Sequence, residues 1–263
     1  MTRWLPILAY HRVCDVPRAE DPLSLCARPR DLERVLRHLT ARDYRLVSLE
    51  TAAEALSGTS PRRDKLACLT FDDGYRDFYT HAFPLLQEYG APATVFLVAG
   101  CIGATNRWDD CYGLPSVPLL NREEILELAA QGVEFGSHTV SHRRLTRLST
   151  AAQKREIFDS KKALEDLLNH PIRFFCYPHI AHDAHVEALV RDAGYSGACG
   201  GEQAANSPYL LHRVNVSQTG RLSTLFRLWG WRYSLQRSRG LRALKRTLLP
   251  SRSTSPELTE VRR

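Results

Sequence analysis

The sequence predicts a single α/β domain folded as a (β/α) barrel. The chain has 263 residues, an ordinary size for one barrel domain. Hydrophobic residues make up 43% of it and charged residues 25%, values that exclude a disordered chain and agree with a globular one. Short apolar runs alternate with segments whose apolar residues recur at helical spacing. Repeated units of this kind are typical of parallel strands covered by helices, and hence of barrels.

The first part of the chain contains two of these units. Residues 4–10 form an apolar run that we predict as the first strand, and residues 29–44 have the periodicity of a helix. Residues 44–48 and 49–56 are predicted as the next strand and helix, and a loop rich in Ser, Pro and Arg follows at 58–65. The inward face of the first helix is predicted to carry Leu32, Val35, Leu36 and Leu39.

The central strand is predicted at residues 66–71, an apolar run that ends in two adjacent carboxylates. An amphipathic helix at 75–89 and a continuous apolar strand at 93–99 follow, and this succession implies a right-handed crossover. Residues 101–120 are expected to form a long loop. Its Trp108 could either stack on a sugar ring or pack within the loop.

The rest of the chain continues the alternation. Asn121 and Glu124 have the spacing of a helix capping pair, and a short strand is predicted at 133–136. Thr150, with Gln153 three residues later, is predicted to open the next helix. The remaining elements are predicted as a strand at 172–178, a helix at 186–193 and a strand at 195–199.

Two short stretches concentrate residues that could do chemistry. Asp72 and Asp73 end the central strand, where a buried carboxylate needs a metal, a hydrogen-bond network or a basic partner. His138 and His142 are four residues apart, so they share one face if their segment is helical. With one Asp they would make a three-ligand metal site that leaves a position open for water. Taken separately, an Asp-Asp-Gly sequence is usually a turn, and a His pair at this spacing usually lies at the surface.

Together the two stretches resemble the motifs of the polysaccharide deacetylase family, the NodB-like enzymes of carbohydrate esterase family 4. The sequences that carry the resemblance are Thr70-Phe71-Asp72-Asp73-Gly74 and His138-Thr139-Val140-Ser141-His142. The resemblance extends over most of the chain, from about residue 8 to about residue 216. It implies a distorted barrel of the NodB type, expected as (β/α)7.

The resemblance also implies a metal-dependent hydrolase that removes N-acetyl groups from an amino-sugar-containing oligosaccharide, polysaccharide or lipid-linked glycan. Asp72 takes the place of the family's general base, and Asp73, His138 and His142 take the places of its metal ligands. Zinc is the first expectation from these ligand types, and Co(II), Ni(II) or Fe(II) also suit two histidines and one carboxylate. Such a cation acidifies water and polarises an amide carbonyl, while a nearby carboxylate accepts the proton.

The sequence departs from the family pattern at residues 175–180. Relatives usually have Gly where this chain has Ile180, and Ile would reshape a loop that needs a left-handed or closely approached backbone there. By alignment with the family motif, the resemblance implies that the backbone N–H of His179 would be the oxyanion donor beside the metal. Other members use an Arg of this motif to hold the catalytic Asp, where this chain has Cys176. Arg213 is the candidate to replace that Arg from a later strand, and the alternative for Arg213 is a surface or core-capping role.

The proton donor is left open among several histidines. His11 ends the first strand, so barrel geometry places it at the mouth of the site, where it could contact substrate or carry a proton. The alternative for His11 is a core or capping role. The competing donors are His179, His182, His185 and His212.

Cysteine usage and the N-terminus bear on the compartment. Seven cysteines are scattered without a C-x-x-C pair, which favours a reducing compartment over a disulfide framework. Residues 1–11 are too short and too polar for a signal peptide, and no apolar stretch reaches transmembrane length. We therefore expect a cytoplasmic protein.

The formal net charge of +7 belongs to one segment, residues 221–250, which contain eight basic residues and no acidic residue. Interleaved aromatic residues would let this segment lie on an anionic membrane, making the protein peripheral to the inner membrane and bringing it to a glycolipid substrate. The alternative is a C-terminal helix that closes the barrel with solvated arginines. Nucleic acid is not expected as a partner, because nothing else marks a fold that binds it. We predict a catalytic barrel over 1–220, this basic amphipathic segment, and a disordered tail over 251–263.

Three classes of function remain open at this point. A metal-dependent deacetylase is supported by all four motif residues. The departure from the family pattern at Ile180 keeps open a second class, a hydrolase of another small amide, such as a deformylase or a deacylase of a secondary metabolite. Retention of both carboxylates and both histidines argues against a non-catalytic carbohydrate-binding relative. A zinc protease of the H-E-x-x-H type is excluded, because Thr139 stands where its Glu is needed.

Overall fold

The computed structural model of the chain describes residues 5–58, 65–112, 115–201 and 207–216, all within the unit Met1–Thr219. A second unit, Gly220–Arg263, lies outside the described residues. The predictions for residues 221–250 and 251–263 therefore fall outside the described part of the chain.

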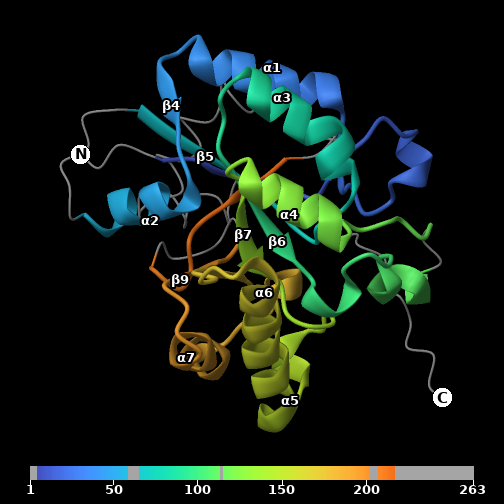
Figure 1. The fold of residues 1–263 in the computed structure, drawn as a ribbon, viewed down its shortest axis with the longest axis vertical. Helices are drawn as coiled ribbons and strands as arrows, with labels where there is room; N and C mark the ends of the chain where they lie inside the picture. The colour runs from blue at the N-terminus through green and yellow to red at the C-terminus, as the bar shows by residue number, and fades with distance from the viewer. Residues whose placement is uncertain (1–4, 59–64, 113–114, 202–206, 217–263) are drawn as a thin grey trace, which may run out of the picture. The chain divides into compact units, whose positions relative to one another are not determined.

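Parallel strands form the centre of the described unit (Figure 1). Their order is β10-β1-β5-β6-β7-β8-β9, and β4 (Tyr44–Leu46) pairs with the first residues of β5. The bounds of the other strands in this sheet are β1 (Ile7–Tyr10), β5 (Lys65–Phe71), β6 (Ala93–Leu97), β7 (Glu134–Ser137), β8 (Phe174–Cys176), β9 (Gly197–Cys199) and β10 (Val214–Asn215). A separate pair is formed by β2 (Arg12–Val13) and β3 (Cys26–Ala27).

One short segment joins the two edges of the main sheet. Leu211 forms a parallel bridge with Cys199 of β9, and its N–H donates to the carbonyl of Ala198 at 2.8 Å. Three residues later, Val214 of β10 pairs in parallel with Leu8 of β1. The structure thus confirms the α/β class and the distorted (β/α) barrel.

Helices connect the strands, and Figure 1 shows α1, α3, α4 and α6 following one another along the outside of the sheet. Their bounds are α1 (Pro29–Thr40), α2 (Leu49–Ser57), α3 (Phe83–Glu88), α4 (Arg122–Ala130), α5 (Thr150–Lys154), α6 (Ser160–Leu168) and α7 (Ala184–Asp192). π-helical turns precede α3 at Phe78–Ala82 and separate α5 from α6 at Arg155–Asp159. The predicted inward face of α1 is confirmed, because Leu32, Val35, Leu36 and Leu39 are all buried.

The segment 101–120, predicted as a long loop, contains regular structure in its described residues. It contains a 3-10 helix at Arg107–Tyr112, and Leu119 within it forms an antiparallel bridge with Tyr75. The prediction of a helix from residue 75 is wrong at its start, because the bridge holds Tyr75 and helical structure begins only at Phe78.

Two helix starts were marked by capping signals in the sequence. Asn121 and Glu124 form the predicted capping box at the start of α4. α5 does begin at Thr150, but its cap is Ser149, whose hydroxyl accepts a hydrogen bond from the Ala152 N–H at 3.4 Å. The side chain of Gln153 instead donates to the carbonyl of Leu145, so it takes no part in capping.

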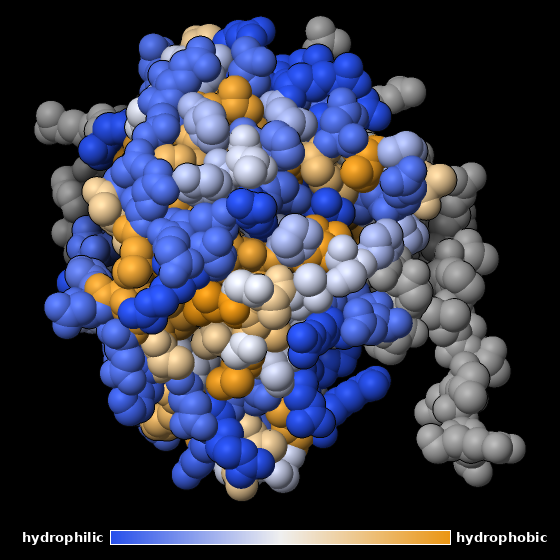
Figure 2. Space-filling view, turned by 45° about the vertical axis from the view of Figure 1, so that its right-hand side comes forward, coloured by the Kyte–Doolittle hydropathy of each residue, from blue (hydrophilic) through white to orange (hydrophobic). Residues whose placement is uncertain are grey.

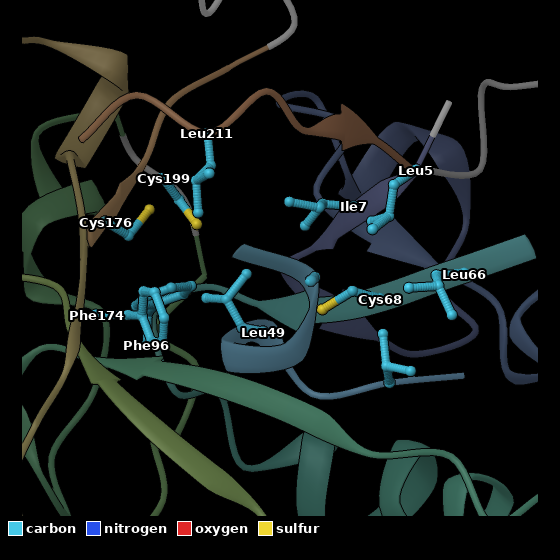
Figure 3. Close-up of a cluster of buried hydrophobic side chains, with 12 residues drawn as sticks. Leu5, Ile7, Leu49, Leu66, Cys68, Phe96, Phe174, Cys176, Cys199 and Leu211 are labelled. Carbon is cyan, nitrogen blue, oxygen red and sulfur yellow. The ribbon is translucent and has the colours of Figure 1, made fainter. Parts of the chain in front are cut away.

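Cysteine side chains form part of the apolar core. Figure 3 shows Cys68, Cys176 and Cys199 among leucine, isoleucine and phenylalanine side chains. Burial raises the pKa of these thiols, that of Cys199 to about 12, so they stay protonated. Cys68 and Cys199 act as small apolar groups, whereas Cys176 also contacts the Arg213 guanidinium. Elsewhere, Cys14 Sγ lies 2.7 Å from Cys26 Sγ, and the described cysteines are free thiols.

The surface mixes polar and apolar residues. On the face seen in Figure 2, hydrophilic residues dominate the margin and apolar residues show mainly across the middle. The large apolar side chains that stay exposed in the described residues are Leu23, Leu126, Phe158 and Ile180. Within the described part of the chain, no helix combines the length and apolar character needed to cross a bilayer.

Candidate active site

The two adjacent carboxylates follow β5 directly, at the carboxyl end of the strand. Asp73 and Gly74 both have left-handed backbones, with φ of 72°. The positive φ at Gly74 favours Gly, and a Cβ there would lie 2.7 Å from Leu97 Cδ2 and displace that side chain. Asp72 is 4% exposed and Asp73 is 3% exposed. The two buried carboxylates have separate sets of partners. Each partner set can therefore compensate the cost of burying one of the two negative charges.

Asp73 faces the two histidines. Its Oδ1 atom lies 3.3 Å from His138 Nε2 and 3.2 Å from His142 Nε2, and all three side chains are buried. That oxygen makes no well-aligned hydrogen bond among the described residues. Ligand atoms bound tetrahedrally to zinc lie about 3.3 Å from one another. The two distances from Asp73 Oδ1 match this spacing, and the three ligand atoms all lie within 4.8 Å of one another, so the set is suited to one divalent cation. Burial alone would raise the pKa of Asp73, but the neighbouring imidazoles hold it well below its usual range.

Hydrogen bonding and a tight turn orient the two histidines. His138 follows β7 directly, and its Nδ1 lies 2.8 Å from the backbone carbonyl of Cys176. An Nδ1–H that donates to a carbonyl leaves Nε2 available to a metal. The shared helical face suggested by the four-residue spacing is absent. Instead, Thr139 and His142 have left-handed backbones, with φ of 68° and 58°, and the turn returns His142 to the side of His138.

Arg213 binds the other carboxylate in a bidentate ion pair. Its Nη1 and Nη2 donate to Asp72 Oδ1 and Oδ2, both at 2.7 Å, and Arg213 is 3% exposed. Further hydrogen bonds from the guanidinium reach Thr70 Oγ1 and the carbonyl of Gly200, each at 3.1 Å. Burial, the largest single influence, would raise the pKa of Asp72, but the Arg213 guanidinium together with the nearby His11 and His138 outweighs burial, and the pKa is lowered. Asp72 is therefore held ionised and in a fixed orientation.

The position of Arg213 depends on the small side chain of Cys176. The Cys176 Sγ atom lies 3.0 Å from Arg213 Nη2 and 3.6 Å from Asp72 Oδ2. A side chain as long as Arg at position 176 would occupy the space of this guanidinium. From the sequence, Arg213 was the candidate to hold Asp72. The structure places its guanidinium against the Asp72 carboxylate.

The lowered pKa of Asp72 predicts a pH-dependent contribution to stability. A carboxylate whose folded pKa lies below its unfolded value of about 3.9 stabilises the fold above that value and loses this contribution as the pH falls through the folded pKa. We expect the difference in unfolding free energy between wild type and Asp72→Asn to shrink as the pH falls from about 7 to about 3. Urea denaturation of the metal-free proteins measures it, and a constant difference would contradict the lowered pKa.

Three further rings surround this cluster. His11 Nε2 lies 3.9 Å from Asp72 Oδ2, and the rings of His179 and Trp108 each lie 4.6 Å from the ring of His142. Burial, with the nearby His142 as the next cause, lowers the pKa of His179 to about 4. Its imidazole is therefore neutral at neutral pH and a poor proton donor. Trp108, predicted either to stack on a sugar or to pack in its loop, lies beside the histidines.

The backbone at Ile180 keeps the conformation that favours Gly. His179 and Ile180 have φ of 55° and 57°, and a left-handed backbone costs a residue such as Ile on the order of 1–3 kcal/mol. The Ile180 side chain is 46% exposed and packs toward Gly201, where a Cβ would lie 2.5 Å from Ile180 Cδ1. The chain therefore carries an exposed apolar side chain next to His179, on a strained backbone.

Two other candidate proton donors contact groups outside the cluster. His182 Nδ1 lies 2.9 Å from Glu187 Oε1, and His185 Nε2 lies 3.3 Å from Thr150 Oγ1. His11 is thus the candidate donor that approaches the Asp72 carboxylate.

One buried carboxylate beside the histidines was not predicted from the sequence. Glu156 accepts hydrogen bonds from the segment between His138 and His142. In the sequence, Glu156 is one of several acidic residues in an amphipathic helix. Its position on the buried face of that helix is the one signal that could have identified it as a buried carboxylate.

The fold and these side chains define a class of protein, a barrel hydrolase with a three-ligand cation site beside an ionised carboxylate. The family model for polysaccharide deacetylases matches residues 59–198. The chain belongs to the polysaccharide deacetylase family, and it is an enzyme of the carbohydrate deacetylase class.

Individual relatives are similar over most of the chain. YxkH of Bacillus subtilis is 29% identical over 217 residues, which cover 81% of this chain and 71% of YxkH. The poly-beta-1,6-N-acetyl-D-glucosamine N-deacetylase of Staphylococcus epidermidis is 26% identical over 246 residues, covering 84% of this chain and 82% of that protein. The solved structure of the deacetylase PplD of Streptococcus pyogenes, in complex with acetate, has a TM-score of 0.72 at 27% identity and covers 85% of this chain and 96% of that one.

Proposed function

We propose that this enzyme hydrolyses N-acetyl groups of amino-sugar residues in an oligosaccharide, polysaccharide or lipid-linked glycan, with a divalent metal held by Asp73, His138 and His142. The observation that carries the proposal is the approach of both Nε2 atoms to Asp73 Oδ1, next to the ionised Asp72. The staphylococcal relative acts on an N-acetylglucosamine polymer, and the PplD structure contains acetate, the acid that N-acetyl hydrolysis releases. Both findings support the proposal.

Four residues of the site take part in this reaction beside the metal ligands. Asp72, held by Arg213, accepts a proton from the attacking water. The metal, when bound, supplies a Lewis acid that polarises the acetamide carbonyl and lowers the pKa of water. His11 donates a proton to the leaving amine, and the backbone N–H of His179 donates a hydrogen bond to the developing oxyanion. Two imidazoles and one carboxylate favour zinc, with Co(II), Ni(II) and Fe(II) as the alternatives.

The competing functions differ in what the protein releases. Hydrolysis of another small amide would release formate or a longer acid in place of acetate. A protein that only binds carbohydrate would release no acid, and it would have no use for an ionised carboxylate beside a cation site.

Metal removal is expected to reduce activity strongly. We expect one divalent ion per chain, and chelation should slow acetate release from N-acetylglucosamine oligomers by about 100-fold or more. Restoring Zn(II), Co(II), Ni(II) or Fe(II) one at a time identifies the preferred ion. His142→Ala should bind the ion weakly, whereas His170→Ala, a change of an exposed histidine, should bind it as wild type does. Full acetate release by the metal-free enzyme would contradict the metal dependence.

The location of the enzyme stays a prediction. A cytoplasmic site of action and contact of residues 221–250 with an anionic membrane both rest on the sequence, and that segment lies outside the described residues.

A further inference from the structure

We propose that Glu156 is a positioning residue that fixes the segment between the two histidines and thereby sets the place of His142 relative to Asp73. The inference rests on the proposed function, in which His142 is a metal ligand. It adds a residue that touches neither the metal nor the substrate but acts through the backbone of residues 139–142.

Glu156 engages this segment with both carboxylate oxygens. Its Oε2 accepts the N–H groups of Val140 and Ser141 at 3.0 and 2.9 Å, and its Oε1 accepts the Ser141 hydroxyl. Glu156 is 8% exposed, and among the ion pairs of the described residues none includes it. Two successive backbone N–H groups that point at one anion form a nest, which compensates the buried charge. The histidine segment is therefore the main partner of this carboxylate.

The segment needs such support because its backbone is strained. Thr139 and His142 have left-handed conformations that residues other than Gly rarely adopt. These conformations persist only where the surroundings over-determine them. From the side of β6, the N–H groups of Ala99 and Gly100 donate to the carbonyls of Thr139 and Val140, both at 2.9 Å. The carboxylate holds the N–H groups of the same segment, so the turn is fixed through its donors and its acceptors alike.

Glu156 lies in an irregular part of its helix. Glu156 lies in the π-helical turn Arg155–Asp159, and single π turns are frequent at functional sites. One turn further on, the Ser160 hydroxyl lies 2.8 Å from the Ser137 hydroxyl at the end of β7. The same stretch of helix thus contacts the strand that leads to His138 and the turn that leads to His142.

Metal affinity measured by competition with a chelator tests the proposal, with Co(II) as the probe. Glu156→Ala is expected to weaken Co(II) binding about 10- to 100-fold, the range seen for residues that orient metal ligands, and to change the Co(II) absorption spectrum. Glu156→Gln keeps an oxygen acceptor and should lose less. Asp159→Asn, a change of an exposed carboxylate in the same π turn, is the matched control and should bind as wild type does.

Amide hydrogen exchange in the metal-free protein measures directly whether Glu156 holds the N–H groups of the histidine segment. Glu156→Ala should speed exchange at Val140 and Ser141 while the strands of the barrel keep their protection. If Glu156→Ala does not fold, Glu156→Gln and Ser141→Ala give the same comparison with smaller expected effects. Wild-type Co(II) affinity, spectrum and exchange in the Glu156 variants would overturn the proposal. If wild type itself binds no metal, the proposed function fails, and the exchange rates still decide whether Glu156 fixes the segment.

Discussion

Arg213→Ala is expected to lower the free energy of unfolding by about 3–5 kcal/mol, the usual cost of removing one partner of a buried ion pair. The reason is that Asp72 would stay buried without its bidentate partner. The pKa of Asp72 would rise, because burial raises it and the guanidinium is the largest of the influences that lower it. Protonated Asp72 cannot accept a proton, so kcat should fall by about 10²- to 10⁴-fold. Urea denaturation and acetate release measure the two effects.

Two further variants show that these effects come from the buried pair. Arg173→Ala removes an arginine whose partner, Glu50, is at the surface, and it should cost no more than about 1 kcal/mol. Asp72→Asn combined with Arg213→Met removes both charges, so it should be more stable than Arg213→Ala and still inactive. Wild-type stability and turnover in Arg213→Ala would show that Asp72 does not depend on this arginine.

Asp72→Asn is expected to reduce kcat by about 10²- to 10⁴-fold, the usual contribution of a general base. Asn has nearly the shape of Asp but cannot accept the proton. The metal ligands do not include Asp72, so metal content should stay at one ion per chain. Asp73→Asn gives the contrast, because it should lose both the metal and the activity. Substantial turnover in Asp72→Asn would assign the base to another group.

The place of the site in the fold was predictable because the signals for it are local. An apolar run that ends in Asp72 and Asp73 marks a buried parallel strand with its carboxyl end at the site, and β5 has this form. The alternation of strands and helices around it was likewise enough to predict a barrel. The boundaries were less accurate where distant contacts decide them, as at Tyr75, which is held by Leu119.

The conformation of the histidine segment was not predictable from its own residues. A spacing of four suggested a shared helical face, whereas the segment is a turn with left-handed backbone at Thr139 and His142. Neither residue is Gly, and the local support that the segment does have, a hydrogen bond from the His142 N–H to Thr139 Oγ1 at 2.9 Å, gives no recognisable sequence signal. The other hydrogen bonds that hold the turn come from Ala99 and Gly100 on one side and from Glu156 on the other, and all three lie outside the segment.

The sequence named Arg213 as a candidate partner of Asp72 but did not decide between that role and a surface or core-capping role. Arg213 is 141 residues away in the chain, and it reaches Asp72 because closure of the sheet through Leu211 and β10 brings the two together. The sequence offered an indirect signal, the presence of Cys176 where the family resemblance led us to expect an Arg. Which arginine replaces it depends on tertiary contacts that no local pattern encodes.

The most direct measurement is the release of acetate from N-acetylglucosamine oligomers by metal-loaded wild type and Asp72→Asn, with free amino groups counted in the same samples. We predict equal amounts of acetate and amine from wild type, and release slower by about 100-fold or more from the variant. A wild-type enzyme that carries its full complement of metal and releases neither product from any N-acetylated amino-sugar glycan would contradict N-deacetylation.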